Sequence, residues 1–422
     1  MNKWFRNPIV YVAMVVAIFC GLAFVGAGLP GFGNMPDGTK QMKIVVVDHD
    51  QSTGSKAITE SLKENMPFKV KRTDARISSI KSQLNDRSAA LAVEIPQDFI
   101  KDIRQQRTPN IKFYVNDSNG MLQNSLNRSI ISQMESKIKD NITSKKTVGM
   151  VAGMIAPEIA KQASTQAQKQ AEGIKNPAQL VALKKNIQRQ TKARIKKQAS
   201  QITQKLTGGV TTSTVHLNKI PKNYQYQLAP MFLNLGSYLG VMIMALILTM
   251  TFMSARFKIG KTKAYLSYQI SGFIASVILP FFTVGLLRCE ISFSGSAFWS
   301  LVGSQILFVL AVFEFTSIFT FLCGSLPGML LLLPMMTMQV VAGGGILPRV
   351  VLSGFYQWFS RVTPMYQGIT NAFNALYGGS FSPYNQSLLW IALTGVVCST
   401  LFALIGYRQK TQGTLSSIIK FN

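Results

Sequence analysis

The acidic side chain best placed to do chemistry is Glu314, which lies inside a long apolar segment. Its neighbours in the sequence FVLAVFEFTSIF are almost all hydrophobic, and Gln305 lies nine residues earlier in the same segment. An ionisable group inside a membrane-spanning helix is costly, so it is a candidate for function by default. Two roles are open: Glu314 lines or gates a transport path, or it forms a structural hydrogen bond to a neighbouring helix.

A second candidate site is the stretch 327–377, where helix-breaking residues interrupt an apolar sequence. An apolar run from Pro327 ends in glycines at 343–345, and the broken, arginine-bearing segment ILPRVVLSGFYQWFSRVTP follows. Non-helical backbone at membrane depth survives only when protein or a water-filled cavity covers it. A helix that stops and re-enters in this way is therefore typical of a transport pathway. The alternative is a full span followed by a helix that lies flat at the membrane interface.

The sequence offers few residues for a metal site, a nucleotide site or a catalytic site. The four cysteines lie in or beside apolar segments without paired spacing, and the two histidines, His49 and His216, are isolated. A phosphate-loop-like match at 255–262, ARFKIGKT, lies between two apolar segments, whereas a nucleotide site needs a strand before the loop and a helix after it. We therefore expect no metal site, no cofactor in this chain and no enzymatic activity.

The charge distribution divides the 422 residues into one polar block with apolar flanks. Residues 30–228 hold 32 basic and 15 acidic residues, a net charge of +17, whereas the remainder holds 12 and 2. We predict a polytopic α-helical membrane protein with about six transmembrane helices and one large aqueous domain, 30–228, inserted after the first helix. Apolar runs that fit a membrane lie at 8–29, 229–254, 266–287, 298–323, 327–345 and 385–406.

Basic residues in the short loops predict the orientation. Lys3 and Arg6, the 255–265 loop and the tail that begins at Arg408 all fall on one side of a six-span protein. By the positive-inside rule both termini are cytoplasmic, and residues 30–228 are then extracellular. Long domains translocate largely regardless of their charge, so the basicity of this domain does not oppose that placement.

The predicted extracytoplasmic domain begins with an α/β module at 40–117. Helical patterns separate four strand patterns, of which the last, 111–115, is the final strand that we expect. The four lie at 43–48, 68–72, 90–95 and 111–115.

A helical stalk is predicted at 118–210. Apolar residues recur every four residues from Leu122 to Ile142 and at near-heptad spacing from Leu180 to Leu206. We expect two long helices in a hairpin, with the glycine-bearing segment 147–157 near its tip or crossover. The second helix has a basic face that either attracts a polyanion, such as an anionic cell-wall polymer or lipid head groups, or is only solvated. This face contains Lys184, Lys185, Arg189, Lys192, Arg194, Lys196 and Lys197.

Three sets of residues carry a family resemblance that covers most of the chain. The inserted domain contains KIVVVDHDQSTGSKAI, LAVEIPQDFIKDI and IKFYVNDS; the second span opens with YQLAPMFLNLGSYLGVMIM; and GGGILP and WFSRVTPMYQGITNAFNALYGG precede the last helix. Together with the order of one span, a large insert and five spans, these segments resemble the ABC-2 type transporter permeases, in particular their YhgE/Pip-like branch.

The resemblance implies a permease subunit of an ATP-driven exporter that moves an amphipathic or hydrophobic substrate out across the cell membrane. Such permeases pair two transmembrane halves with two cytoplasmic ATPase subunits. This chain would then need a second permease copy, in a homodimer or heterodimer, and a separate ABC ATPase that uses the ATP. Membrane lipids would surround it, and we expect no nucleic acid partner.

The same resemblance suggests where the sites lie. The substrate would leave along the dimer interface, and the translocation-path candidates are Glu314, Gln305, Gln339, Gly344, Arg349 and Arg361. The segment 2–7 and the 255–265 loop would contact the ATPase, and the coupling candidates in this loop are Arg256, Lys258, Lys261 and Lys263.

Two other functions compete with export. One is a non-transporting envelope protein, either a scaffold of a secretion system or a phage docking protein, in which the stalk is the working part. The other is ion-coupled transport, which would depend on Glu314 alone and finds no repeated halves in the sequence.

Overall fold

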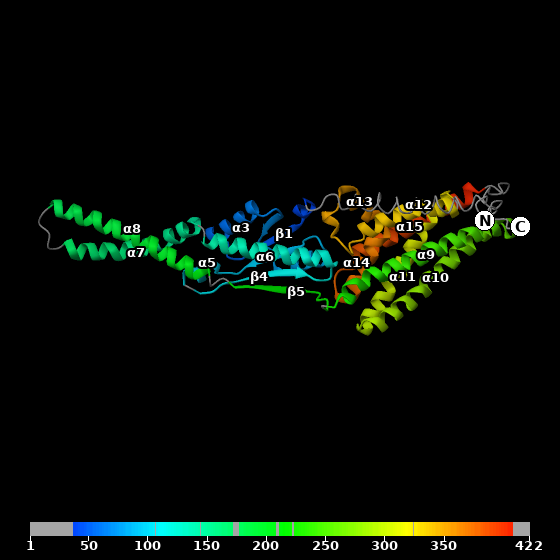
Figure 1. The fold of residues 1–422 in the computed structure, drawn as a ribbon, viewed down its shortest axis with the longest axis horizontal. Helices are drawn as coiled ribbons and strands as arrows, with labels where there is room; N and C mark the ends of the chain where they lie inside the picture. Colours follow the sequence, from blue (N-terminus) through cyan, green and yellow to red (C-terminus); the bar gives the residue numbers. More distant parts are fainter. Residues whose placement is uncertain are drawn as a thin grey trace, which may run out of the picture. The chain divides into compact units, whose positions relative to one another are not determined.

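The computed structural model describes residues 37–105, 107–143, 145–171, 177–207, 211–221, 223–323 and 325–407. These residues form two compact units. One unit contains the long apolar helices, and the other contains a β-sheet and a helical hairpin (Figure 1). The predicted first span, the segment 2–7 and the tail from Arg408 lie outside the described residues.

The sheet unit, Met42–Asn116 and Leu126–Leu217, has five strands in the order β2-β1-β3-β4-β5. Strand β1 pairs in parallel with β2 and β3, β3 pairs antiparallel with β4, and β4 pairs in parallel with β5. The first four strands confirm the predicted ones, but the expectation that 111–115 is the last strand is wrong. The strands are β1 (Lys43–Asp48), β2 (Lys69–Thr73), β3 (Leu91–Ile95), β4 (Asn110–Asn116) and β5 (Thr211–Leu217).

Strand β1 forms the centre of this unit because its sequence, KIVVVD, is apolar on both faces. Ile44, Val46 and Val47 are fully buried, which is typical of a strand covered on both sides. Three helices connect the first four strands, as the alternating pattern predicts. They are α3 (Thr53–Asn65), α4 (Ile77–Asn85) and α5 (Phe99–Arg104).

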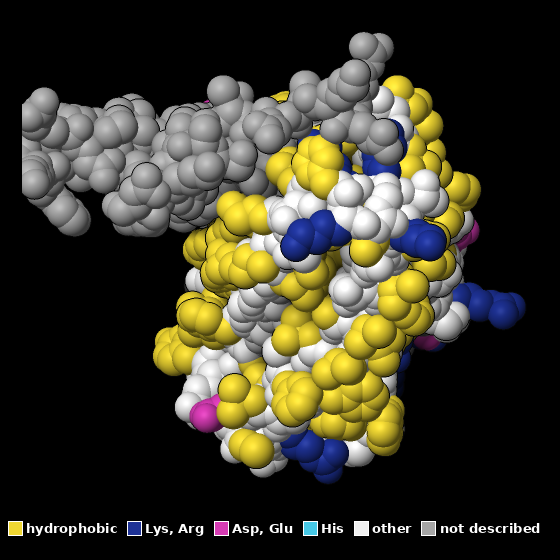
Figure 2. Space-filling model, turned by 90° about the vertical axis from the view of Figure 1, so that its right-hand side faces the viewer, with side chains coloured by type: hydrophobic (Ala, Val, Ile, Leu, Met, Phe, Trp, Pro, Cys, Tyr) yellow, Lys and Arg dark blue, Asp and Glu magenta, His cyan; other side chains and the backbone are white. Residues whose placement is uncertain are grey.

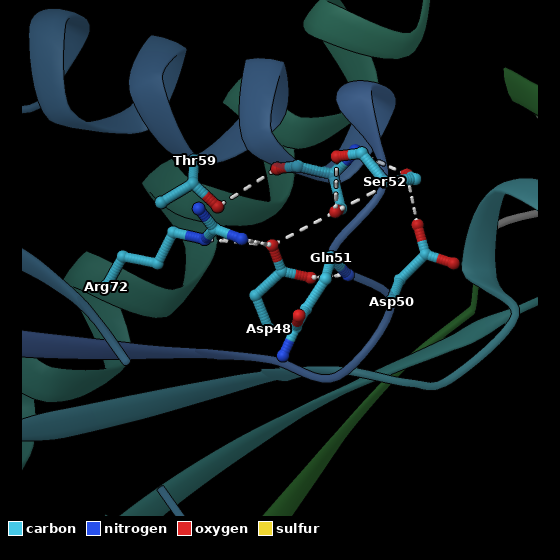
Figure 3. A network of polar contacts seen from close by, with 7 residues as sticks. Asp48, Asp50, Gln51, Ser52, Thr59 and Arg72 are labelled. Atoms are coloured by element: carbon cyan, nitrogen blue, oxygen red, sulfur yellow. Dashed lines mark hydrogen bonds and ion pairs between the residues drawn. The ribbon is translucent and has the colours of Figure 1, made fainter. Parts of the chain in front are cut away.

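A polar network fixes the end of β1 to β2 and to the start of α3 (Figure 3). The buried carboxylate of Asp48 accepts hydrogen bonds from Arg72 Nε at 2.9 Å, from Ser55 Oγ at 3.0 Å and from the backbone N–H of Gln51 at 3.0 Å. Arg72 Nη2 also lies 2.7 Å from Asp48. Ser52 caps α3 by accepting a hydrogen bond from the N–H of Ser55. The carboxylate of Asp48 is thus engaged in local structure.

The stalk consists of α6 (Met121–Thr143), α7 (Lys145–Ala171) and α8 (Pro177–Thr207). Buried Ile130, Met134 and Ile138 confirm the middle of the four-residue pattern in α6. Helices α7 and α8 lie side by side (Figure 1). The stalk therefore has three helices where two were expected. The segment 147–157, expected near the tip or crossover, lies in the first half of α7, away from the end of α7 that leads to α8.

The other unit is a bundle of apolar helices. Its long helices are α9 (Tyr224–Ile259), α10 (Lys261–Glu290), α11 (Gly295–Cys323), α12 (Ser325–Ala342) and α15 (Ser382–Gly406). Among the described residues, four of them are long and apolar enough to cross a membrane: α9, α10, α11 and α15. Helix α12 is apolar but shorter, and it contains Pro334.

The stretch between α12 and α15 is broken into short elements, as its glycines and prolines predict. Helix α12 ends at Ala342, just before the three glycines. The 3-10 turn η2 (Arg349–Val351) and the helices α13 (Gly354–Val362) and α14 (Pro364–Tyr377) follow. Pro364 begins α14 at the first helical position, where proline is favoured because its missing N–H needs no partner there.

Candidate translocation and coupling sites

Glu314 lies in the interior of the bundle, 2% exposed, and faces both α10 and α15. Its carboxylate is 3.4 Å from Gln269 Nε2 on α10 and 3.5 Å from Ser399 Oγ on α15. Gln269 Nε2 also donates to the hydroxyl of Tyr265 at 2.6 Å, and that hydroxyl lies 2.9 Å from Ser399 Oγ. We call these four residues, Glu314, Gln269, Ser399 and Tyr265, the Glu314 cluster.

Close backbone packing accompanies this cluster. A Cβ atom built on Gly395 of α15 would lie 2.7 Å from the backbone carbon of Glu314 and 2.8 Å from its oxygen. Only glycine therefore allows α15 to approach α11 at this level. On the other side, the space that a Cβ of Gly272 on α10 would occupy is filled by the ring of Phe313. Glu314 therefore lies where α10, α11 and α15 pack closely together.

Gln305 and Gln339 are also fully buried, and both contact α9. Gln305 Nε2 donates to Asn234 Oδ1 at 3.0 Å, and Gln339 Nε2 donates to the hydroxyl of Tyr238 at 2.8 Å. Asn234 and Tyr238 are four residues apart, so they lie on one face of α9, one turn from each other. The structure therefore brings these two glutamines to neighbouring turns of the same helix.

Gly344 and Arg349 meet at Tyr366 of α14. Gly344 has a φ of +74°, and a Cβ there would lie 2.8 Å from Tyr366 Cε2, so both backbone and space require glycine. The guanidinium of Arg349 lies 4.9 Å from the centre of the Tyr366 ring, within cation–π range. Arg361, by contrast, has an exposed side chain at the end of α13.

The six path candidates thus do not form one site. They fall into the Glu314 cluster, the glutamine pair on α9, the Gly344–Arg349 junction and the separate Arg361. The Glu314 cluster and the glutamine pair each join helices that are distant in the sequence. In these two groups, polar side chains form hydrogen bonds to one another inside an apolar bundle, where unpaired polar groups are costly.

The coupling candidates lie at a turn of one residue. Helix α9 ends at Ile259, Gly260 has a φ of +86°, and α10 begins at Lys261. No strand lies in this part of the described chain, so the phosphate-loop-like match has no loop to hold a nucleotide. The positive φ explains the glycine in this sequence, because a left-handed backbone is rarely adopted by other residues.

Two of the four basic candidates hold this turn together. Lys261 donates to the backbone oxygens of Leu404 and Tyr407 at the end of α15, where a cation also complements the helix dipole. The guanidinium of Arg256, 8% exposed, lies 4.9 Å from the centre of the Tyr407 ring. Lys258 and Lys263 are exposed instead.

The exposed residues at this end mix charge with apolar side chains. Phe257 and Ile259 are about half exposed beside Lys258. Figure 2 shows a face of the protein on which hydrophobic side chains predominate and Lys and Arg gather in separate groups. Lys258 and Lys263 are therefore available for contact with a partner, whereas Arg256 and Lys261 are engaged inside the chain.

Several residues of these sites were not predicted from the sequence. Gln269 and Tyr265 lie four residues apart in α10, which is a spacing that could have indicated a polar face. Asn234 and Tyr238 show the same spacing in α9. Ser399 carries no such signal, because a serine is common in a membrane helix.

Comparison with known proteins gives one match. A family model described as "ABC-2 family transporter protein" matches residues 9–404, nearly the whole chain. No curated protein and no solved structure matches.

Proposed function

The chain belongs to the ABC-2 family of transporter proteins, and we propose on this basis that it is the permease subunit of an ATP-driven exporter. The family match and the apolar helices both support a multi-pass membrane permease that acts in transport. The observation that carries the proposal is the match over residues 9–404, because it includes the inserted sheet unit as well as the bundle. The substrate would be amphipathic or hydrophobic, and the branch would be the YhgE/Pip-like one.

The orientation proposed for the chain has both termini in the cytoplasm. Support comes from the basic residues at the Gly260 turn, which lie at the same end of the bundle as the end of α15 because Lys261 contacts Leu404 and Tyr407. Clustered basic residues in short connections mark the cytoplasmic side. The sheet unit and its hairpin would then lie outside the cell.

ABC-2 permeases typically work with a cytoplasmic ABC ATPase, and this chain would bind its ATPase at the Gly260 turn. Lys258 and Lys263 would make the contact, and Arg256 and Lys261 would transmit it. Arg256 and Lys261 contact the end of α15, so a movement of the Gly260 turn would displace α9, α10 and α15 together. The bundle would tilt against a second permease copy, either identical or related.

The experiment is purification of the tagged full chain in mild detergent, with mass spectrometry of what comes with it. A stoichiometric ATPase is expected, and Lys258→Glu with Lys263→Glu should lower its recovery about tenfold or more, because like charges across an interface are strongly unfavourable. Lys56→Glu with Lys81→Glu makes the same charge change at exposed positions of α3 and α4 and should have no effect.

Other outcomes identify a different function. Recovery of secretion or envelope proteins without an ATPase would replace the exporter by the scaffold. Equal ATPase recovery in both double variants would be compatible with the exporter proposal but would contradict the assignment of the Gly260 turn as the site that binds the ATPase.

A further inference from the structure

Helix α8 carries four basic side chains in a straight row. Lys185, Arg189, Lys192 and Lys196 follow one another at spacings of four, three and four residues, so they lie on one face of the helix. All four are exposed. Neighbouring members are about 5–6 Å apart at Cβ, and the row extends about 16 Å along the helix axis. We call these four residues the basic row.

The charge of this row is not balanced within the hairpin. Helices α7 and α8 together contain twelve basic residues and one acidic residue, Glu158. Among the described side chains, no ion pair involves a member of the row. Like charges three or four residues apart destabilise a helix. The row contains three such neighbouring pairs, so the helix carries a local cost that a bound polyanion would remove.

The hairpin lacks the apolar face that a membrane-surface helix needs. Leu183, Ile187 and Ile195 of α8 are half-buried, and Ile187 lines the groove between α7 and α8. No large hydrophobic side chain is strongly exposed in the described part of α7 and α8. A helix that lies in a bilayer interface buries such a face among the lipids. The surface therefore favours a hydrated polymer over anionic lipid head groups.

We propose that the basic row binds a linear, phosphate-rich polymer, with successive phosphates of the polymer following the row along α8. Flexible lysine side chains adapt to the spacing of the phosphates, and binding would release counterions from the polymer. The proposal depends on the hairpin alone and on no step of transport. It would give the inserted unit a role in holding the permease near a polyanion outside the membrane.

The hairpin offers a matched control on the same helix. A groove of about 450 Å³ between α7 and α8 is lined by Arg194 and Lys197, together with Ile159, Ile187 and Gln190. Arg194 and Lys197 have the same types and the same three-residue spacing as Arg189 and Lys192, but they lie outside the row. Replacing either pair by glutamine removes two charges and keeps a good helix former.

The test uses the full chain in nanodiscs of zwitterionic lipid and labelled inorganic polyphosphate as the probe. Arg189→Gln with Lys192→Gln should weaken binding about tenfold and reduce the slope of log affinity against log salt by about 1.4, as expected for two lost phosphate contacts. Arg194→Gln with Lys197→Gln should weaken binding less than about threefold, because these residues contribute only long-range attraction. Circular dichroism checks that both variants keep their helicity.

Two outcomes would overturn the proposal. Equal losses in the two variants would mean diffuse attraction to a basic helix pair and no defined row. Association with vesicles that contain phosphatidylglycerol, without measurable affinity for polyphosphate, would assign the row to the membrane surface.

Discussion

The bundle and the sheet unit differ in the side chains that they expose. In the bundle, Gln305 and Glu314 are 0% and 2% exposed, whereas Phe282 and Trp390 are 73% and 63% exposed. In the sheet unit Ile44, Phe99 and Phe113 are fully buried, and the basic residues at 184–197 are exposed. The difference reflects the surrounding solvent, because hydrocarbon accepts exposed apolar side chains whereas water drives them inside.

In both units some glycines are closely packed and others face open space, and two pairs show the contrast. At Gly395 and Gly272 of the bundle, atoms of a neighbouring helix occupy the space that a Cβ atom would need. Gly149 and Gly153 of α7 have nothing within 4 Å of that position. Small residues in membrane helices let backbones approach, and in water the same residues only weaken a helix. The contrast predicts substitutions with opposite signs.

The largest effect is expected at Asp48, where the sheet unit departs from its own pattern by burying a carboxylate. Asp48→Ala should lower the unfolding free energy of this unit by about 3 kcal/mol or more, because Arg72 and Ser55 lose their partner. Pulse proteolysis of the full chain measures this change in unfolding free energy. Glu60→Ala breaks an exposed pair with Lys63 and should change nothing measurable; a large loss there would contradict the distinction.

Gly395→Ala comes next and tests the tight packing of the bundle. The added methyl group would meet the backbone of Glu314, so a loss of about 1–3 kcal/mol is expected. The thermal midpoint for loss of monodispersity in detergent is the measurement. Gly406→Ala makes the same change at the end of the same helix, where nothing lies within 4 Å. Equal midpoints for the two variants would show that α15 does not pack closely against α11.

A smaller effect is expected when Glu314 itself is changed. Glu314→Ala removes the carboxylate that Gln269 and Ser399 face and should cost about 1 kcal/mol, in line with hydrogen bonds between membrane helices. Glu314→Gln keeps a hydrogen-bonding group and should leave both stability and transport near those of the parent. Altered transport by Glu314→Gln at normal expression would instead place Glu314 in the translocation path.

The smallest effect has the opposite sign. Gly153→Ala in α7 should stabilise the hairpin by about 0.5–1 kcal/mol, because alanine loses less backbone entropy than glycine and meets no neighbour there. Resistance of α7 to limited proteolysis in the full chain is the measurement. Destabilisation would instead show that another part of the protein packs closely against Gly153, as α11 does against Gly395 in the bundle.

The local elements were predictable where a short stretch of sequence contains the whole signal. KIVVVD predicts a buried strand, and the long apolar runs predict membrane helices, because hydrophobic periodicity and length are local properties. Strand β5 was missed because TTSTVHL is largely polar and only partly buried. Its place depends on parallel pairing with β4, a hundred residues earlier in the chain.

The sites show the same division at the level of single residues. Glu314 was identifiable because a carboxylate in an apolar run is unusual, but its partners Gln269 and Ser399 lie 45 and 85 residues away. The four basic coupling candidates were alike in the sequence. Packing separated them, since Arg256 and Lys261 contact the end of α15, whereas Lys258 and Lys263 are exposed.

The sequence by itself determined the class of protein, the polar insert between apolar segments and the positions where helices must break. Composition, hydropathy and the conformational limits of glycine and proline are sufficient for these. Only the tertiary structure decided which polar side chains pair, which glycines are contact points and which basic residues remain free. Those properties arise between helices that are distant in the chain. A local sequence pattern does not determine which distant side chains come into contact when the helices pack.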